Sequence, residues 1–330
     1  MRRARAFWRW TGLIASGLIL AGCAAQTNPD AAEPSPAASA DAPISGTFDV
    51  GDDRKMYLEC AGSGSPTVVL ISGQRASADD WKIVADGVSS PSVWSLVADD
   101  TRVCAYDRPG TPVGDAPSRS DPVAQPAGAQ RMADDLSALL DAAGITPPLV
   151  LAAHSAGGLV ARLYAAEHPD RVSGMVLVDA LSEGLRDAMT ADQWALQKPL
   201  LRGDIDASIL EYPALEWIDA DTSFAQLKAA PAMAQMPLVV ISADEPIGPS
   251  IPALKAAGAI GQEIPDDFGF VTDAAQHDSQ AYLASRVAGA VHITETDSGH
   301  NVHYQRPALV ADAIIDVVDR VRRGVDVAAD

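Results

Sequence analysis

The sequence predicts an α/β fold in which helices flank a mostly parallel sheet. Short runs rich in β-branched residues alternate with helical patterns along the chain. Some runs are apolar at every position, as in Thr67–Ile71, which indicates a strand buried on both faces, as in parallel sheets. With 48% hydrophobic and 21% charged residues among 330, the chain is neither disordered throughout nor a fibrous repeat. We expect strands over 56–60, 67–71, 102–106, 149–152, 174–178, 238–241 and 291–294.

Two helices have clear amphipathic patterns. Residues 130–143 place Met132 and Leu136 on one face, and Gly144 follows them, a residue typical of helix C-termini. The last helix is expected over 307–322, because this segment starts at a proline and continues with an apolar stripe.

Two long segments interrupt the alternation of strands and helices. Residues 181–236 lie between two expected strands and carry Trp194 and Trp217 among acidic and alanine-rich stretches. Residues 246–285 form a second excursion rich in Pro, Gly and Ala. Since loops of this length without secondary structure are uncommon, we predict that 181–236 form a helical cap inserted after the sixth strand. The second segment is expected to be a longer crossover that borders the same cavity.

The first residues have the layout of a secretory signal. Residues 1–22 are expected to be a signal peptide, since several arginines precede an uncharged run over 11–21. This run is shorter than the roughly 20 residues that a membrane-spanning helix needs. Residues 20–23, Leu-Ala-Gly-Cys, resemble a bacterial lipobox, with Cys23 as the lipidated residue. The sequence therefore predicts an exported protein, anchored by its lipid to the outer face of the bacterial cell membrane.

A tether and a single domain are expected to follow. Residues 23–45 are rich in Ala, Pro and Ser, which favours a flexible tether, and residues 46–326 are expected to form the folded domain. The full chain has 44 acidic and 24 basic residues, a net charge of −20. Removal of 1–22 takes away four arginines and no acid, which leaves 20 basic residues and a net charge of −24. This charge argues against nucleic acid as a partner and leaves membrane attachment to the lipid.

A strand runs into a helix through small residues at 149–158, Leu-Val-Leu-Ala-Ala-His-Ser-Ala-Gly-Gly. This stretch resembles the nucleophile elbow of the α/β-hydrolase superfamily, Gly-x-Ser-x-Gly, with Ala153 in place of the first glycine. Residues two positions either side of the nucleophile are small because bulk there would collide with the neighbouring strand and helix. The resemblance implies that Ser155 is the nucleophile.

Further elements of this family follow. Residues 106–110, Tyr-Asp-Arg-Pro-Gly, match its common turn after the fourth strand, and residues 296–300 end in Ser-Gly-His before the final helix. The resemblance covers about 47–322 and implies an eight-stranded α/β-hydrolase fold of the exported, esterase-like kind, with His300 as the base. The other histidines have different expected places. His154 should point away from the nucleophile and His168 should end a helix, whereas His277, His292 and His303 should lie on the surface or against the cap, with the pocket wall as an alternative for His303.

The resemblance leaves two candidates for the acid of the triad. The family places it after the sixth or the seventh strand, since both ends can reach the histidine. Asp179 stands at the end of the sixth expected strand, an arrangement similar to that of some haloalkane dehalogenases, although a structural residue capping the strand would give the same pattern. Asp244 follows the seventh strand, two residues earlier than is usual. We take Asp179 as the first choice and Asp244 as the alternative acid.

The family also implies an oxyanion hole. By resemblance, the backbone N–H groups of Gln74 and Ala156 would hold the oxyanion of the tetrahedral intermediate, and Gly73 would let the backbone approach the substrate oxygen. The sequence contains no glycine-rich phosphate loop, metal-ligand cluster or dinucleotide motif. We therefore expect no cofactor and no metal.

The leading hypothesis is hydrolysis of a small carboxylic ester through an acyl-enzyme on Ser155, with the cap shaping an apolar acyl pocket. A serine nucleophile argues against dehalogenase and epoxide hydrolase activity, because those relatives need a carboxylate. The alternatives are a catalytically idle binding protein on the same fold, and an amidase or peptidase. The sequence predicts no oligomeric state.

Two cysteines remain beside Cys23. In the α/β-hydrolase sheet the second and fourth strands are neighbours, and these strands carry Cys60 and Cys104. Export to an oxidising compartment would let the two thiols join. The resemblance therefore implies a Cys60–Cys104 disulfide.

Overall fold

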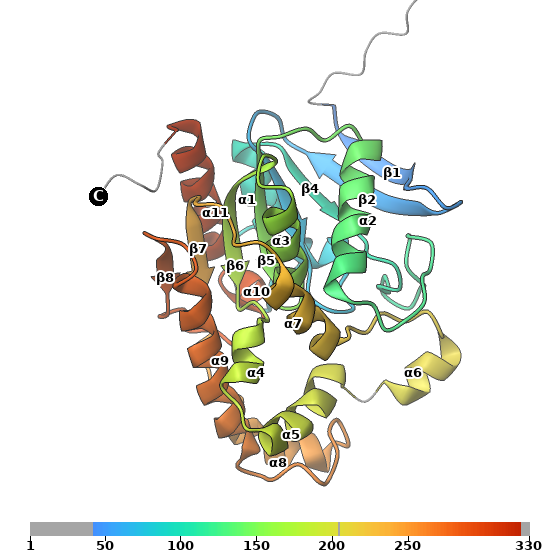
Figure 1. Ribbon diagram of the computed structural model, residues 1–330, viewed down its shortest axis with the longest axis vertical. Coiled ribbons are helices and arrows are strands. Elements are labelled where there is room, and N and C mark those ends of the chain that lie inside the picture. Colours follow the sequence, from blue (N-terminus) through green and yellow to red (C-terminus); the bar gives the residue numbers. More distant parts are fainter. Residues whose placement is uncertain (1–41, 204, 325–330) are drawn as a thin grey trace, which may run out of the picture. The chain divides into compact units, whose positions relative to one another are not determined.

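The computed structural model describes residues 42–203 and 205–324 of the chain. Within these residues, eight strands form one sheet in the order β1-β2-β4-β3-β5-β6-β7-β8. The pairs β1–β2 and β2–β4 are antiparallel, and every other pair is parallel (Figure 1). The predicted eight-stranded, mostly parallel sheet is confirmed. The strands are β1 (Ile44–Asp49), β2 (Lys55–Ala61), β3 (Thr67–Ile71), β4 (Val103–Tyr106), β5 (Leu149–His154), β6 (Val172–Val178), β7 (Leu238–Ile241) and β8 (Val291–Ile293).

Helices cover both faces of the sheet. Helices α1 and α11 pack on one face, and α2, α3 and α9 pack on the other. The two helices predicted from amphipathic patterns are α2 and α11, and both are confirmed. The helices on the two faces are α1 (Val93–Asp100), α2 (Ala129–Ala142), α3 (Gly157–Glu167), α9 (Phe268–Ala284) and α11 (Pro307–Arg322), with the short helices η1 (Ala78–Lys82) and α10 (Val302–Gln305) beside them.

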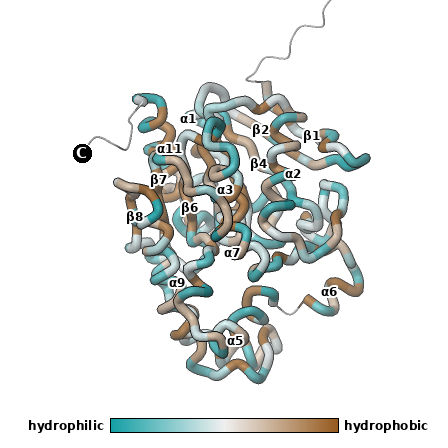
Figure 2. The backbone as a smooth tube through the Cα atoms, viewed as in Figure 1, coloured by the Kyte–Doolittle hydropathy of each residue, from teal (hydrophilic) through white to brown (hydrophobic). Residues whose placement is uncertain are grey.

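The central strands are buried on both faces because two separate cores meet on them. In β3, Val69 and Ile71 belong to one core, whereas Val68 and Leu70 belong to the other. This division follows from the alternation of side chains along a strand. Figure 2 shows apolar residues in brown along β6 and β7, which also lie inside the sheet. An apolar run such as Thr67–Ile71 is therefore the sequence signature of an interior strand.

The two long excursions are helical and lie on either side of β7 in the chain. Residues 181–236, for which we keep the name cap, contain four helices, and the segment between β7 and β8 contains α9 and two shorter helices. The cap helices are α4 (Glu183–Asp187), α5 (Ala191–Arg202), α6 (Asp206–Glu211) and α7 (Ala220–Ala229), and the shorter helices after β7 are η2 (Gly248–Ser250) and α8 (Ile251–Ala256).

The first strand lies outside the ranges that we expected. β1 begins at Ile44, two residues before the predicted start of the domain at 46. Its residues alternate between half-buried and exposed positions, and it is an edge strand that pairs only with β2. Such a short, half-exposed strand leaves little hydrophobic pattern in the sequence. The predicted signal peptide (1–22), Cys23 and most of the predicted tether lie outside the described residues.

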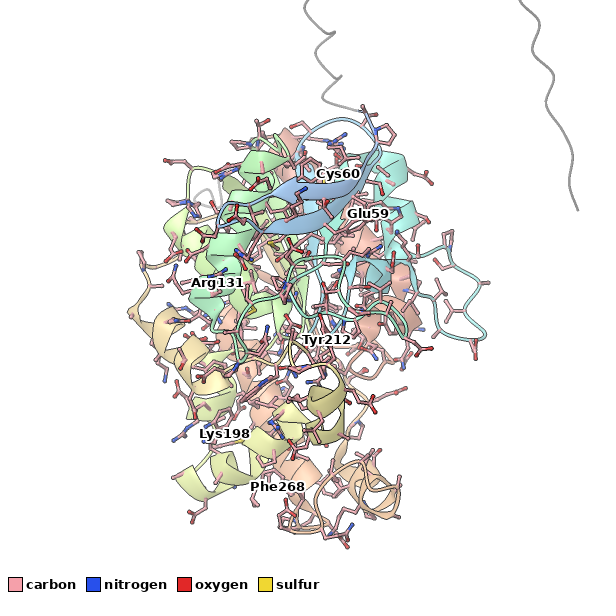
Figure 3. The ribbon with its side chains drawn as sticks, turned by 90° about the vertical axis from the view of Figure 1, so that its right-hand side faces the viewer. Glu59, Cys60, Arg131, Lys198, Tyr212 and Phe268 are labelled. Atoms are coloured by element: carbon pink, nitrogen blue, oxygen red, sulfur yellow. A yellow bond between two sulfur atoms is a disulfide. The ribbon has the colours of Figure 1, made fainter. Side chains whose placement is uncertain are left out.

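A disulfide joins Cys60 to Cys104. The two residues are directly paired between the antiparallel strands β2 and β4. In Figure 3, Cys60 lies at the opposite end of the view from Lys198 of α5 and Phe268 of α9. The bond therefore fastens the sheet at a distance from the cap.

Among the described residues, no helix combines the length and the apolar character that crossing a membrane requires.

Candidate active site

A cavity of about 1090 Å³ lies where the central strands end. Residues that follow β3, β5, β6 and β8 border it, and so do side chains of the cap and of the segment after β7. The residues from the strand ends are Gly73, Ser155, Asp179 and His300, and apolar residues of the surrounding helices are Leu185, Leu200, Leu201, Ile251 and Leu254. Ligand sites of α/β sheets lie at this edge.

Ser155 occupies a strained turn between β5 and α3. Its φ angle is +51°, a left-handed conformation that residues other than glycine rarely adopt. A Cβ added to Gly157 would lie 2.5 Å from the carbonyl oxygen of Ile71, and one added to Gly158 would lie 2.6 Å from Ala180. The turn is therefore too crowded for any side chain at either glycine, as the nucleophile-elbow pattern requires.

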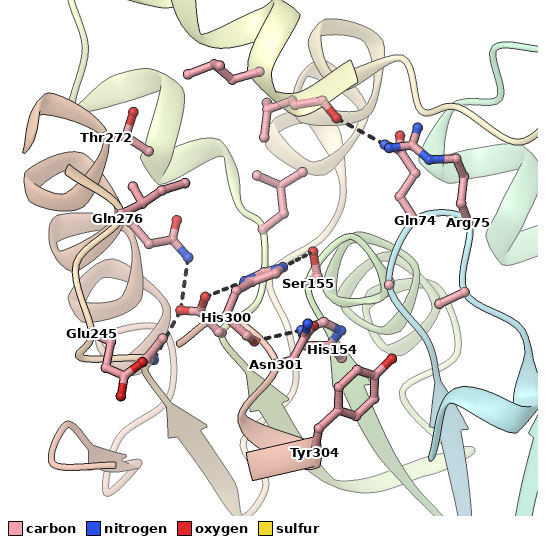
Figure 4. A pocket seen from close by; sticks show the side chains of 18 of the residues that line it. Gln74, Arg75, His154, Ser155, Glu245, Thr272, Gln276, His300, Asn301 and Tyr304 are labelled. Carbon is pink, nitrogen blue, oxygen red and sulfur yellow. Dashed lines mark hydrogen bonds and ion pairs between the residues drawn. The ribbon is translucent and has the colours of Figure 1, made fainter. Parts of the chain in front are cut away.

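Three side chains form a hydrogen-bonded chain in this cavity (Figure 4). The Ser155 hydroxyl lies 2.9 Å from Nε2 of His300, and Nδ1 of His300 lies 2.6 Å from Oδ2 of Asp179. The other carboxylate oxygen of Asp179 accepts hydrogen bonds from the Ala243 backbone N–H and the Gln276 side chain, at 3.3 and 3.2 Å. Asp179 is thus buried and fixed, whereas the His300 side chain is 53% exposed to the cavity.

Asp244, the alternative acid, has a different place. Its carboxylate accepts hydrogen bonds from the backbone N–H groups of Thr296, Asp297 and Ser298, and from the Thr296 hydroxyl. Desolvation would raise the pKa of Asp244, but these hydrogen bonds outweigh it and lower the pKa. Asp244 therefore fastens the loop that leads to His300, and of the two candidates the structure brings only Asp179 to the imidazole.

The two expected oxyanion donors are backbone N–H groups beside the elbow. Within the described residues, the backbone N–H groups of Gln74 and Ala156 have no hydrogen-bond acceptor. The carbonyl of Ser155, in the same peptide as the Ala156 N–H, accepts from Gly158 and Leu181 at 3.0 and 2.8 Å. Since the C=O and N–H of a trans peptide point in opposite directions, these bonds turn the Ala156 N–H away from α3.

The loop of Gln74 lies against the nucleophile. A Cβ added to Gly73 would lie 3.3 Å from the Ser155 Cβ and 3.0 Å from Nδ1 of His154. A side chain at position 73 would therefore push this loop away from the elbow. Gly73 lets the backbone pass beside Ser155, as its place in the family pattern implies.

We expected His154 to point away from the nucleophile, and the structure places it in the cavity wall, against the main chain of the predicted base. Its Nε2 lies 2.9 Å from the carbonyl oxygen of His300, and its ring lies 4.6 Å from the His300 ring. Burial lowers its pKa well below the usual value, and the nearby His303 and His300 add to this effect. A neutral His154 that donates from Nε2 thus holds the main chain of His300, while the adjacent Ser155 contacts its side chain.

His303 was expected on the surface, against the cap or beside the pocket, and it is buried. Its Nε2 lies 2.9 Å from Asp80, which also accepts a hydrogen bond from the Tyr304 hydroxyl. Ligand atoms of Asp80, His154 and His303 all lie within 4.8 Å of one another. Since Asp80 and His303 bond each other directly, the cluster serves to fasten α10 to η1.

Comparisons with known proteins agree with this geometry. A family model described as the alpha/beta hydrolase family matches residues 68–313. The chain is 32% identical over 162 residues to an uncharacterized protein of Schizosaccharomyces pombe, a match that covers 43% of this chain and 29% of the relative. It is 31% identical over 129 residues to the putative carbamate hydrolase RutD of Azorhizobium caulinodans, which covers 39% of this chain and 42% of the relative. The chain therefore spans less than half the length of these two relatives.

Solved structures share the fold. The structure of Est816, described as an N-acyl homoserine lactone degrading enzyme, resembles this one with a TM-score of 0.52 and 20% sequence identity. The match covers 82% of this chain and 100% of that one.

Proposed function

Because the chain belongs to the alpha/beta hydrolase family, whose model matches residues 68–313, we propose that it is a serine hydrolase of carboxylic esters. The observation that carries this proposal is the hydrogen-bonded chain from Ser155 through His300 to Asp179. It lies beside two backbone N–H groups that have no acceptor in the described part of the chain. This arrangement has the nucleophile, the base, the acid and the oxyanion donors that acyl transfer needs.

The chemistry follows from these contacts. Nε2 of His300 accepts the Ser155 proton as Oγ attacks the ester carbonyl, while Asp179 holds the Nδ1–H and stabilises the imidazolium. The N–H groups of Gln74 and Ala156 bind the oxyanion. His300 then donates its proton to the leaving alcohol, which leaves an acyl group on Ser155. A water molecule, deprotonated by His300, attacks this acyl-enzyme and releases the carboxylic acid.

The cavity favours an apolar acyl group. Its volume of about 1090 Å³ is at the upper end of common ligand sites, so it holds a substrate larger than acetate esters. The cavity wall includes leucines of the cap, Leu185, Leu200 and Leu201, and Ile251 and Leu254 of α8. We therefore propose that the acyl chain lies under the cap.

Hydrolysis of p-nitrophenyl esters by residues 42–324 and by the full chain tests this proposal. We expect turnover that the substitution Ser155→Ala reduces to the rate of the buffer. Thr111→Ser, a conservative change at a buried hydroxyl that hydrogen-bonds its own turn and lies outside the cavity wall, is the matched control. Equal rates for the wild type and Ser155→Ala would overturn the enzyme proposal and favour an idle binding protein.

A second candidate is carbamate hydrolysis, which the name of the Azorhizobium caulinodans relative suggests. A carbamate carbonyl is attacked by the same nucleophile and leaves a carbamoyl group on Ser155. Rates with matched p-nitrophenyl butyrate and p-nitrophenyl N-propylcarbamate distinguish the two. The ester proposal predicts that p-nitrophenol is released faster from the butyrate than from the carbamate at steady state. The reverse order would favour carbamate chemistry.

We also propose lipid anchoring through Cys23, which rests on the sequence of residues 1–23. The expected result is that the full chain is found with bacterial membranes and that Cys23→Ala releases it. The remaining charge of −24 supports a purely lipid-mediated attachment, since anionic headgroups repel such a domain. A membrane fraction that keeps the Cys23→Ala protein would contradict the proposal.

A further inference from the structure

Two buried charges stand behind the loop of residues 72–75, which we name the oxyanion loop. Arg108 belongs to the turn after β4, and Glu216 belongs to the cap segment between α6 and α7. Their side chains are 2% and 1% exposed, and Nε of Arg108 lies 2.5 Å from Oε1 of Glu216. Burying such a pair has a desolvation cost that apolar residues would avoid. Burial of the pair is therefore weak evidence that it stabilises the fold, and its contacts decide what else it does.

The guanidinium of Arg108 holds the oxyanion loop by its carbonyl groups. It donates to the carbonyl of Ser72 at 2.8 Å and to that of Gly73 at 2.5 Å. The peptide between Gly73 and Gln74 is trans, so its N–H points away from the carbonyl that Arg108 binds. Arg108 thus sets the direction of the Gln74 N–H, the group proposed to bind the oxyanion.

Glu216 holds the same loop on the other side of Gln74. One of its oxygens accepts a hydrogen bond from the backbone N–H of Arg75 at 2.6 Å. The side chain of Gln74 extends the contact to the cap, since it donates to the carbonyl of Leu201 and accepts from the N–H of Ile218. The loop of residues 72–75 is thus hydrogen-bonded to the turn after β4 through Arg108 and to the cap through Glu216 and the Gln74 side chain.

The cap segment is itself placed closely against that turn. The N–H of Glu216 donates to the carbonyl of Gly110 at 3.0 Å, and a Cβ added to Gly110 would lie 2.2 Å from the carbonyl oxygen of Ala214. Gly110 also has a φ of +85°, which favours glycine. The backbones meet without room for a side chain, so the position of Glu216 is fixed.

We propose that Arg108 and Glu216 form a positioning pair, through which the cap aligns the Gln74 N–H with the substrate oxyanion. This inference rests on the proposed function of Ser155 and deepens it. Neither residue touches substrate, and both act through the oxyanion loop. The oxyanion hole is then complete only when the cap segment is docked.

A second buried pair provides a matched control. Arg162 of α3 and Glu183 of α4 are 5% and 2% exposed and form two bonds of 2.7 Å. Glu183 also accepts a hydrogen bond from the Tyr282 hydroxyl. Among the described residues, neither member of this pair has a hydrogen bond to the oxyanion loop.

The test compares Arg108→Met/Glu216→Leu with Arg162→Met/Glu183→Leu. Both charges of a pair are replaced together, because a single substitution would leave the other charge unpaired in the interior. For the first variant we expect kcat to fall by about 10- to 100-fold, with KM nearly unchanged, because a misplaced donor loses contact mainly in the transition state. Binding of a trifluoromethyl ketone, whose adduct with Ser155 places an oxyanion in the hole, should weaken by a similar factor. The second variant should keep both values close to the wild type.

Hydrogen exchange of residues 72–78 gives a measurement that needs no substrate. Among the residues that the structure describes, Glu216 is the only acceptor of the Arg75 N–H. We expect this N–H to exchange faster in Arg108→Met/Glu216→Leu and at the same rate in the control variant. A folded first variant with wild-type kcat, or with unchanged exchange at Arg75, would overturn the positioning role, as would equal losses in both variants. If instead Ser155→Ala had the activity of the wild type, the proposed function would fail, and the exchange data would still decide whether the pair orders the loop.

Discussion

The carboxyl edge of the sheet and the cap contribute different things to the cavity. At the edge, Ser155, Asp179 and His300 each follow a strand, and short polar contacts of 2.6 to 2.9 Å join them. The cap contributes leucines to the cavity wall and Glu216 to the oxyanion loop. In the proposed function the edge supplies the reacting groups, whereas the cap supplies an apolar surface and a fixed charge behind the site.

Side chains at the edge and side chains in the cap are held in place in different ways. Strand ends are fixed by the ladder of the sheet, so a side chain that follows a strand has a position determined by the fold. A cap is fixed only by its docking contacts, and residues there can change the substrate without changing the chemistry. We expect substitutions at the edge to abolish turnover and substitutions in the cap to change which ester is preferred.

The largest effect is expected at the acid, where two aspartates of the edge are compared. Asp179→Asn should lower kcat by about 10⁴-fold, because the amide no longer orients the imidazole or stabilises its charge. Asp244→Asn should have a much smaller effect, because that carboxylate binds backbone N–H groups of residues 296–298. Steady-state kinetics with one ester measure both. A greater loss in Asp244→Asn would contradict the assignment of the acid.

The second largest effect is expected in how stability depends on pH, which should differ between the carboxyl edge of the sheet and the cap. Burial lowers the pKa of His154 and His303, so below about pH 6.5 the unfolded chain binds protons that the folded chain does not. The free energy of unfolding should then fall as the pH decreases below 6.5, by at most about 1.4 kcal/mol per pH unit for each histidine, and less once the folded group also takes up its proton. Urea unfolding between pH 7.5 and 5 measures this slope, and His303→Gln should reduce it.

In the cap, Glu183 of α4 should affect stability over a lower pH range than the histidines do. Burial would raise the pKa of Glu183, but Arg162 and Tyr282 lower it from 4.5 to about 2. Its contribution to stability is therefore present above about pH 4.5 and is lost as the pH falls toward 2. Glu183→Gln should flatten the stability curve in this lower window alone. A curve that is flat from pH 7.5 to 5, or that loses its upper slope in Glu183→Gln, would contradict these assignments.

The smallest effect is expected in the cap. Leu200→Trp places an indole in the cavity wall, where it should collide with a long acyl chain. Activity toward p-nitrophenyl decanoate should fall by about tenfold, and activity toward p-nitrophenyl acetate should stay near that of the wild type. Ala195→Trp is the matched control, since position 195 lies on the exposed face of the same helix. Equal losses on both esters would contradict the placement of the acyl chain under the cap.

Local patterns account for what the sequence could predict. The interior strands are apolar at every position, and the turn around Ser155 and the segment before His300 are each specified by a few adjacent residues. The choice between Asp179 and Asp244 was not local, because both follow neighbouring strands. It depends on the path of residues 294–300, which Asp244 itself holds. Asp179 has a left-handed backbone conformation, with a φ of +40°, and no sequence pattern predicted it.

The contacts that sequence inspection missed join distant segments. Arg108 lies in the Tyr-Asp-Arg-Pro-Gly turn that we noted, but its partner Glu216 is 108 residues further along the chain. Glu216 lies in a cap segment without a motif, and only the docking of the cap brings the two together. The role of His154 was missed for the same reason. Its contact with the His300 carbonyl depends on the fold of the loop that carries His300.

The central claim is that Ser155 is the activated nucleophile of this site. Reaction of the protein with a fluorophosphonate probe, followed by peptide mass spectrometry, tests it most directly. We predict one adduct per chain, located on Ser155, formed much more slowly in Asp179→Asn and absent in Ser155→Ala. A wild-type protein that takes no label, or a label on another residue, would contradict the claim.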